Sequence, residues 1–592
     1  MMSQRIRRIA STQELKMHLL GIIVGLLSGL VAVGFRALID FMRAGFITGL
    51  AILGIFGALA SPVIAALIQG PFVEKFAPEA RGNGVPQVIE AIALEGGRID
   101  KKVPIAKVVA SSLTLASGAS AGREGPIAQI GAGVASWFGS KLNLNRLQMK
   151  TLVVCGAAGG IAATFNAPMG GLLFGLELLM GGVLTVSAIT VALSSVTAVA
   201  VAQLFYGANP SIIIPYTGVA TLNEIPLFLV VGIVLGLFGI LWMHIFYTVR
   251  KWFLRVNFAR MFKPTLGAIV VGMLAIVDVM LFTTPVLPSL EYGFINSLIQ
   301  EISMNQIPIL MLLFALGLKI FGTAFTLGSG MSGGDIAPNL VMGSIIGSLF
   351  ATTVNSLFPG TITHPVIFAA VGMAGFMAAV AHAPITMIAL VIDMTHDYFL
   401  IVPLMFAAAT AQAVTKLYNP RSMYLEELHE EGIDLFHGIN MSVLKNLTAR
   451  DIMTKKPTIL KESMTAIEAI EVVEETKHTK FPVVNDKGEI IGTVIAEDLR
   501  IEPKEDGSQY TVAELVDKDF LKVYPDINVD ELLYKMIEKD EGHAVVVDPD
   551  NPNKMIGFIT KTDILKSYRY AVKKSSSDDI DLYPKPRIFM NK

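Results

Sequence analysis

The segment SGASAGREGPIAQIGAG, residues 117–133, places Arg123 and Glu124 side by side in a long apolar, glycine-rich tract. Charged side chains inside a membrane are costly and are usually functional. Pro126 follows closely, and proline is typical of the first turn of a helix, where backbone N–H groups and the helix dipole attract anions. We therefore expect Glu124 to be a tethered anion that competes with a passing anion and withdraws when protonated. The alternative is a carboxylate that pairs with Arg123 and only stabilises the helix start.

Two other segments repeat this combination of glycines, a proline and an apolar run. They are GNGVP, residues 82–86, and GGDIAP, residues 333–338. Three helix starts directed at one point would offer backbone donors to a desolvated anion and bind it weakly enough to release it. The breaks thus favour an anion over a divalent cation, which requires oxygen acceptors.

The composition indicates a membrane protein with a soluble attachment. Hydrophobic residues make up 53% of the 592 residues and charged residues only 16%, against about 25% in soluble domains. Most of the charge follows residue 420. Several apolar segments before it are shorter than the roughly 20 residues of a simple span, or are cut by glycine or proline, which predicts broken helices.

The first twelve residues, MMSQRIRRIAST, are basic and precede an apolar run from His18 to Phe35. Basic residues favour the cytoplasmic side of a first span, and no cleavage site for a signal peptide follows. We expect a multi-pass protein of the cell inner or plasma membrane, with its N-terminus and its soluble part in the cytoplasm. The net charge of −2 gives no indication of nucleic-acid binding.

The membrane part repeats itself. FNAPMGGLLFGLEL, residues 165–178, resembles AHAPITMIALVIDM, residues 381–394, and aligning their prolines places Glu177 opposite Asp393. Two related halves with matching broken helices predict a transporter whose site lies at the interface of the repeats.

A second repeat follows in the soluble part. Residues 447–499 and 510–565 each read as an apolar strand, an amphipathic helix and two strands around a turn. Each unit is small for an independent core, so we expect the two to pair.

These motifs resemble those of a known family. GNGVP, GREGP, FNAP, GGDIAP and AHAP, which follow one another in this order along the chain, are similar to motifs of the CLC chloride channels and proton/chloride antiporters, over about residues 15–425. The last 150 residues resemble the paired CBS domains that many CLC proteins carry. The resemblance implies an all-α polytopic membrane protein with inverted repeats and broken helices, followed by a small α/β CBS pair, and a homodimer with one anion pathway per subunit. It implies a transporter and not an enzyme.

The expected division of the chain follows from this resemblance. It comprises a transmembrane domain at 1–427, a linker at 428–446, CBS domains at 447–503 and 510–570, and a polar tail at 571–592.

The resemblance also assigns roles to residues. Glu124 matches the gating glutamate, and Lys107 and Arg123 match basic residues near the path. Glu124 and Glu177 are the candidates for a proton path. The residues expected around the anion, chloride or a relative of it, are Asn83, Gly84, Gly125, Gly334, Asp335, Ile336, Ala337 and Tyr424.

Three positions depart from the family pattern. Leu178 stands where proton-coupled members usually have a second glutamate, which favours channel-like or weakly proton-coupled transport over full exchange. Exchange by another proton route remains the alternative. Asn83 replaces a serine, so anion choice is open. Asp335 adds a carboxylate beside a helix start, where it would point away, pair with a cation such as Lys319, or titrate.

The CBS pair is expected to regulate transport and to bind an adenine nucleotide, ATP, ADP or AMP. GFITKTD, residues 557–563, carries the family's nucleotide pattern intact, whereas Ile495 replaces the hydroxyl residue in GTVIAED, residues 492–498. One competent site would be lined by Thr458, His478, Thr479, Thr560 and Asp563. The alternative is a dimerisation module that binds no nucleotide.

Other function classes fit less well. A zinc protease needs HExxH, but HEEGI at 429–433 has Ile433 at the second ligand position, and we expect no metal. GSGMSG at 328–333 fits a dinucleotide motif without its strand context. A CBS-regulated divalent-cation transporter remains a further alternative, with Glu124, Glu177, Asp335 and Asp393 as ligands.

Overall fold

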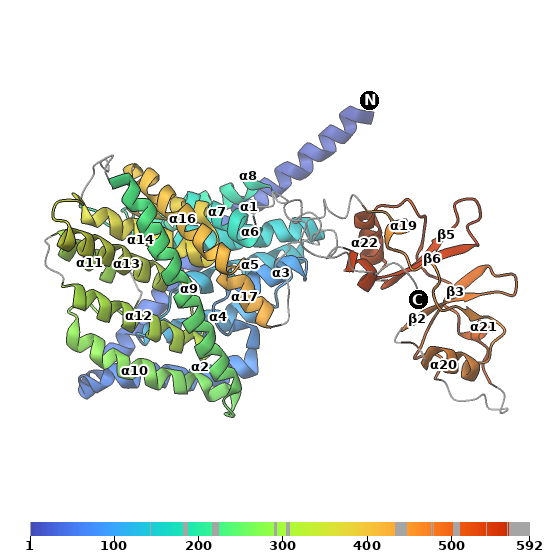
Figure 1. Ribbon diagram of the computed structural model, residues 1–592, viewed down its shortest axis with the longest axis horizontal. Helices are drawn as coiled ribbons and strands as arrows, with labels where there is room; N and C mark the ends of the chain where they lie inside the picture. The colour runs from blue at the N-terminus through green and yellow to red at the C-terminus, as the bar shows by residue number, and fades with distance from the viewer. Residues whose placement is uncertain are drawn as a thin grey trace. The chain divides into compact units, whose positions relative to one another are not determined.

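The chain folds into two compact units, Met1–Phe436 and His437–Lys592. The first is helical, and the second combines short helices with two small sheets (Figure 1). The computed structural model describes residues 2–142, 144–181, 187–215, 224–288, 293–303, 308–431, 447–474, 476, 479–500, 509–539, 541–564 and 566–567. Most of the expected linker and the polar tail lie outside the described residues.

The helices of the first unit vary widely in length. Nine apolar helical segments among the described residues are long enough to cross a membrane, and three others are shorter. This confirms the predicted mixture of spans and broken helices. The helices are α1 (Met2–Leu50), α2 (Phe56–Phe76), α3 (Val85–Ala93), α4 (Lys102–Ala116), α5 (Glu124–Lys141), α6 (Arg146–Phe165), α7 (Pro168–Leu173), α8 (Ala188–Tyr206), α9 (Ile225–Arg255), α10 (Lys263–Leu281), α11 (Gly293–Ser303), α12 (Ile309–Gly328), α13 (Ile336–Leu357), α14 (Pro365–Ala381), α15 (Pro384–Thr395), α16 (Ile401–Tyr418) and α17 (Met423–Glu430).

The internal repeat is visible in how the helices cross. Gly131 of α5 meets the backbone of Gly156 in α6, and Gly343 of α13 meets that of Gly372 in α14. Gly131 and Gly343 each lie five residues after the proline of their break, Pro126 and Pro338. A side chain at either contact would overlap a carbonyl oxygen, and small residues generally mark such close helix crossings in membranes.

The repeat also sets where helices end. Asn166 ends α6 and His382 ends α14, both in the left-handed conformation, with φ of 57° and 56°. Each lies two residues before the proline that begins the next helix, Pro168 of α7 or Pro384 of α15. Every residue of α14 from Val366 to Ala381 is buried, as expected for a helix that is apolar all round.

The second unit contains two copies of a three-stranded sheet. The strands are β1 (Leu460–Lys461), β2 (Lys480–Val484) and β3 (Ile490–Ile495), then β4 (Lys522–Val523), β5 (His543–Val547) and β6 (Met555–Thr560). In each copy the first strand is parallel to the second and the third is antiparallel to it. The accompanying helices are α19 (Ala449–Ile452), α20 (Ala466–Glu474), α21 (Val512–Leu515) and α22 (Val529–Glu538).

The two copies exchange their leading segments. Ala449 of α19 is buried in the core of the second sheet, and Val512 of α21 is buried in the core of the first. Lys480 of β2 also pairs with Glu541 of the second copy at 2.9 Å. The two copies therefore form one interlocked unit, which explains how such small cores are stabilised.

Candidate functional site

The three glycine–proline breaks meet at one point inside the first unit. Gly122 and Gly334 exchange two backbone hydrogen bonds, each 2.7 Å long, as in a short antiparallel bridge. The N–H of Gly333 donates to the carbonyl of Gly82 at 3.1 Å. The starts of α3, α5 and α13 are therefore held together by their own backbone groups.

Glycine is required where these segments touch. A methyl group on Gly125 would come within 2.6 Å of the carbonyl oxygen of Asn83. Gly84 has a φ of 103°, a conformation that disfavours other residues. The glycines thus let the first and second breaks approach to backbone contact.

The two basic residues expected near the path serve this scaffold. Lys107 is fully buried, and its Nζ donates to the carbonyl oxygens of Gly82 at 2.7 Å and Ala80 at 3.2 Å. Arg123 is 7% exposed and directs a terminal nitrogen at the carbonyl of Thr164, 3.5 Å away. Lys107 thus fixes the first break.

Glu124 lies at the convergence of the breaks. Its side chain is 1% exposed. A methyl group on Gly122 would meet both Oε2 of Glu124 and the backbone nitrogen of Ala337, so the carboxylate and the start of α13 border the same side of that glycine. Ile336 and Ala337 are also buried, and their N–H groups belong to the first turn of α13, which has no helical acceptors for them.

Asp335 accepts hydrogen bonds from three neutral side chains. Nδ2 of Asn83 donates to its Oδ1 at 2.6 Å, and the hydroxyl of Tyr424 donates to the same oxygen at 3.1 Å. Nδ2 of Asn339 donates to Oδ2 at 3.2 Å. Lys319, one expected partner, instead donates to the carbonyl oxygens of Val286 and Leu287. The carboxylate of Asp335 is therefore directed at the cluster formed by Asn83, Asn339 and Tyr424.

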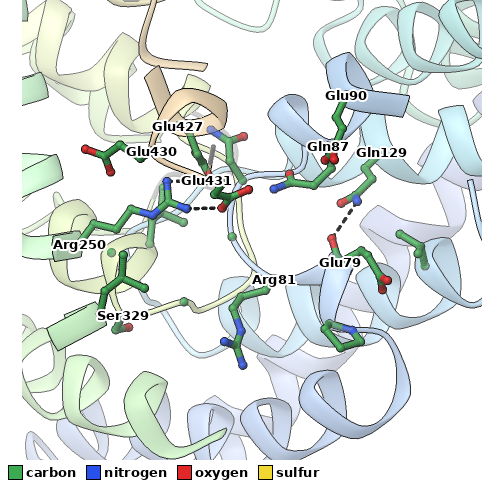
Figure 2. Close-up of a pocket in the computed structure, with 18 of the residues that line it drawn as sticks. Glu79, Arg81, Gln87, Glu90, Gln129, Arg250, Ser329, Glu427, Glu430 and Glu431 are labelled. Atoms are coloured by element: carbon green, nitrogen blue, oxygen red, sulfur yellow. Dashed lines mark hydrogen bonds and ion pairs between the residues drawn. The ribbon is translucent and has the colours of Figure 1, made fainter. Parts of the chain in front are cut away.

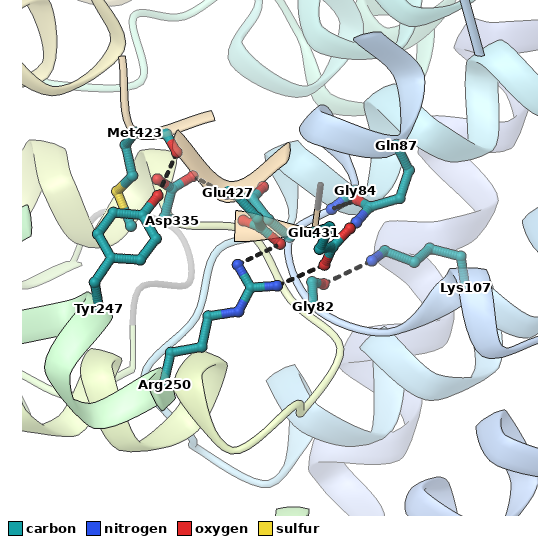
Figure 3. Close-up of polar contacts among 11 residues, drawn as sticks. Gly82, Gly84, Gln87, Lys107, Tyr247, Arg250, Asp335, Met423, Glu427 and Glu431 are labelled. Atoms are coloured by element: carbon teal, nitrogen blue, oxygen red, sulfur yellow. Dashed lines mark hydrogen bonds and ion pairs between the residues drawn. The ribbon is translucent and has the colours of Figure 1, made fainter. Parts of the chain in front are cut away.

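Tyr424 is positioned by α17, which is anchored to α9. Tyr247 donates to the carbonyl of Met423, and Arg250 pairs with Glu427 at 3.2 Å and with Glu431 at 2.7 Å (Figure 3). Asn339, Arg250 and Glu427 are not among the residues that the sequence indicates for the site. Asn339 follows Asp335 by four residues, a helical spacing that signals contact, but no sequence pattern pairs Arg250 with α17.

A cavity of about 900 Å³ leads to the first break. Gly82 and Asn83 form part of its wall, whereas Asp335, Tyr424 and Glu124 do not line it. The charged residues that line the cavity come from several elements (Figure 2). They are Glu79, Arg81, Glu90, Glu95, Asp100, Arg250, Arg260, Lys263, Glu427, Glu430 and Glu431. A small ion or a proton carrier has access to Asn83 from this cavity.

Glu177 and Asp393 each cap the helix of the other repeat. Oε2 of Glu177 accepts from the N–H and the hydroxyl of Thr386 at the start of α15, both at 2.6 Å. Oδ2 of Asp393 accepts from the N–H groups of Met169 at 2.8 Å and Gly170 at 3.0 Å at the start of α7. Glu177 and Asp393, which the repeat aligns, thus have the same role, because each caps a helix start in the other half.

The four carboxylates of the cation alternative do not converge. Glu177 and Asp393 bind helix starts away from the breaks. Within the described parts of the chain, no group of three or more histidine, cysteine, aspartate or glutamate side chains is arranged to hold a metal ion. The arrangement does not supply the oxygen ligands that this alternative needs.

Four of the five residues expected at the nucleotide site of the second unit lie within the described residues. Thr560 donates its N–H and its hydroxyl to Oδ2 of Asp563, at 2.9 and 2.8 Å, and the N–H of Asp563 donates back. Thr458 is half-buried and Thr479 is exposed. His478 lies outside the described residues. Asp563 thus acts as a local cap through a single carboxylate oxygen.

Comparison with known families decides the assignment of the first unit. Residues 64–416 match the family model of the voltage-gated chloride channel. The chain belongs to the CLC family. Residues 449–504 and 512–570 match the CBS domain, and CBS domains can bind adenine nucleotides. The chain is thus a multi-pass membrane protein for CLC-type chloride transport, as a channel or an H⁺/Cl⁻ exchanger, and not an enzyme.

Known proteins of this family resemble the chain closely. The H⁺/Cl⁻ exchange transporter ClcA of Vibrio cholerae is 32% identical over 424 residues, which cover 69% of this chain and 88% of the relative. The crystal structure of a slow cyanobacterial Cl⁻/H⁺ antiporter matches 72% of this chain and 99% of its own, with a TM-score of 0.62 and 26% identity. A eukaryotic CLC transporter structure matches 93% of this chain and 98% of its own, with a TM-score of 0.65 and 19% identity, and so shares the fold.

The reciprocal capping predicts a stability effect at Glu177. Glu177→Ala removes the acceptor at the start of α15 and should destabilise the protein by about 1 kcal/mol, within the usual range for lost N-terminal caps. Glu177→Gln keeps an amide oxygen there and should be milder. Thermal unfolding of the purified full chain measures both, with Glu301→Ala on α11 as control. Equal melting of Glu177→Ala and wild type would contradict a capping role.

Proposed function

We propose that chloride passes the point where the starts of α3, α5 and α13 meet, and that Glu124 gates this passage. The observation that carries the proposal is the bonding of the three breaks to one another, with the buried carboxylate of Glu124 beside the first turn of α13. Donors from helix starts suit an anion that must bind and then leave. An ionised Glu124 competes with chloride for these donors, and a protonated one does not.

The donors proposed for chloride fall into two classes. The Asn83 amide and the Tyr424 hydroxyl are side-chain donors, and the N–H groups of Ile336 and Ala337 are backbone donors. The N–H groups of Gly334 and Gly84 already donate, to Gly122 and to Gln87, so these two glycines shape the site instead. Gly125 shares this shaping role, because it lets α5 approach Asn83.

We further propose that coupling to protons is weak or absent. Leu178 is buried in the hydrophobic core and cannot carry a proton, and Glu177 beside it is engaged at the start of α15. This favours channel-like conduction through the pathway. The alternative is exchange by another proton route, because the slow cyanobacterial structure that the chain resembles is a Cl⁻/H⁺ antiporter.

The gate is tested by flux through the purified protein in liposomes. With a chloride gradient the reversal potential should follow chloride, and an added pH gradient should shift it little. Glu124→Gln should raise chloride flux at neutral pH above that of wild type at the same pH, because glutamine imitates the protonated gate.

Controls separate the possible failures of this test. Glu224→Gln alters another buried glutamate, which accepts from the N–H of Thr363, and should keep wild-type flux. A Glu124→Gln variant with unchanged flux would exclude Glu124 as the gate. A potential independent of chloride would exclude the chloride pathway itself, and a large shift with the pH gradient would favour the exchanger.

We propose that the CBS pair binds an adenine nucleotide and regulates transport. Asp563 leaves one carboxylate oxygen for ribose hydroxyls, since its cap uses only Oδ2. Asp563→Asn should keep the cap and weaken ATP or AMP binding to the full chain about tenfold or more, as expected for loss of a charged hydrogen bond. Calorimetry measures the affinity.

The matched control for this variant is Asp451→Asn. Asp451 caps Thr448 with the same two hydrogen bonds in the same unit. The control should bind nucleotide like wild type. Absence of ATP, ADP and AMP binding to wild type would favour a dimerisation module instead.

We also propose that the protein is a homodimer with one pathway per subunit. All three breaks and Tyr424 come from one chain, so each subunit carries a complete site. Light scattering of the detergent-solubilised protein should give two chains per particle, and one chain would contradict the proposal. The basic residues before the first span favour a cytoplasmic N-terminus, which labelling of an N-terminal cysteine from outside intact cells would contradict.

A further inference from the structure

Asp335 lies where two proposed chloride donors converge. Its Oδ1 receives the hydrogen bonds of both Asn83, at 2.6 Å, and Tyr424, at 3.1 Å. Asn83 lies in the loop before α3, and Tyr424 lies in α17. The two donors therefore reach the same oxygen atom from separate elements. A chloride bound by the same two donors would occupy the position of this oxygen.

Among the described residues, no cation is paired with the carboxylate at this point. Asp335 is fully buried, and its second oxygen accepts from Asn339 at 3.2 Å. The charged and titratable groups on the surrounding elements are Lys107 of α4, Glu124 of α5, Arg250 of α9, Lys319 of α12, and Tyr424 and Glu427 of α17. The hydrogen bonds and ion pairs of the basic residues show whether any of them neutralises Asp335.

Within the described part of the chain, no cation close to the breaks forms a hydrogen bond or ion pair with Asp335, and Arg123 is directed at the carbonyl of Thr164. Lys107 donates to the carbonyl of Gly82, and Lys319 donates to the carbonyls of Val286 and Leu287. Arg250 pairs with Glu427. An ionised Asp335 therefore brings a full negative charge to the place that chloride would take, and two like charges do not share one buried site.

We propose that Asp335 is a second tethered anion, and that chloride occupies the donors of Asn83 and Tyr424 only when Asp335 takes up a proton. This inference rests on the proposed function, because it concerns the same donors. Asn83 also lines the cavity of about 900 Å³, so protons and chloride have a common approach to the cluster. Chloride binding here is then accompanied by uptake of one proton, at a site other than Glu124 and without a glutamate at position 178. This uptake is linked to chloride binding and requires no transfer of the proton across the membrane, so it agrees with the weak proton coupling proposed above.

The test uses the full chain in detergent with Glu124→Gln as the parent, so that the first tethered carboxylate cannot titrate. Chloride is the ligand, and calorimetry measures its affinity at acid, neutral and mildly alkaline pH. We expect affinity to fall as pH rises, by up to about tenfold for each pH unit once Asp335 is ionised. Adding chloride to the weakly buffered parent should take up to about one proton per chloride.

Glu124→Gln/Asp335→Asn should bind chloride with the same affinity at each pH, and more tightly than the parent at mildly alkaline pH. The matched control is Glu124→Gln/Asp397→Asn. Asp397 is another buried helix-capping aspartate, which accepts from the N–H of Phe399 at 2.9 Å. Asparagine is also a good N-cap, so this variant should keep the pH dependence of the parent.

The outcomes separate this inference from the proposed function. Binding to the parent that is independent of pH and takes up no proton would overturn the role of Asp335 and leave the chloride site in place. Absence of chloride binding to the parent at every pH would overturn the site, and the role of Asp335 with it. The proton uptake needs only the parent, so the inference stays testable if the Asp335→Asn variant does not fold.

Discussion

The structure of the first unit depends on one constraint, the need to satisfy backbone polar groups where helices are interrupted in a membrane. Interrupted helices are tolerated there only where the freed groups meet protein or line a cavity. Gly122 and Gly334 meet this need by bonding to each other, and Gly333 does so with Gly82. The carbonyl of Gly82 also accepts from Lys107, so the helices that follow the breaks begin beside one another.

Contacts that recur in both halves of the repeat hold the helices around the breaks in position. Gly131 and Gly343 let corresponding helix pairs cross at backbone contact, and Glu177 and Asp393 each cap the helix of the other half. Each half therefore supports the other through contacts of the same kind. Side chains with fixed neighbours hold a binding site in position better than isolated loops do.

In the mechanism that we propose, the chemistry of the site follows from competition among anions for few donors. Glu124 and Asp335 are both buried carboxylates, and both lie against groups that would serve chloride. Protonation removes such a competitor without moving the scaffold. Under this proposal the pathway would respond to pH through its own side chains, even though Leu178 lacks the usual proton-carrying group.

The sequence by itself determined the fold class, the repeat and the three breaks, because glycine, proline and apolar runs express local backbone preferences that need no partner. The family followed from the resemblance of its motifs to those of known proteins. It also predicted that Glu124, Asn83 and Tyr424 belong to one site. Only the tertiary structure decided what Asp335 contacts, since Asn83 and Tyr424 reach it from positions 252 and 89 residues away. The tertiary structure also decided the partners of Lys107 and Lys319, the anchoring of α17 by Arg250, and the exchange of segments in the CBS pair. Contacts between distant segments depend on packing and leave no local pattern in the sequence.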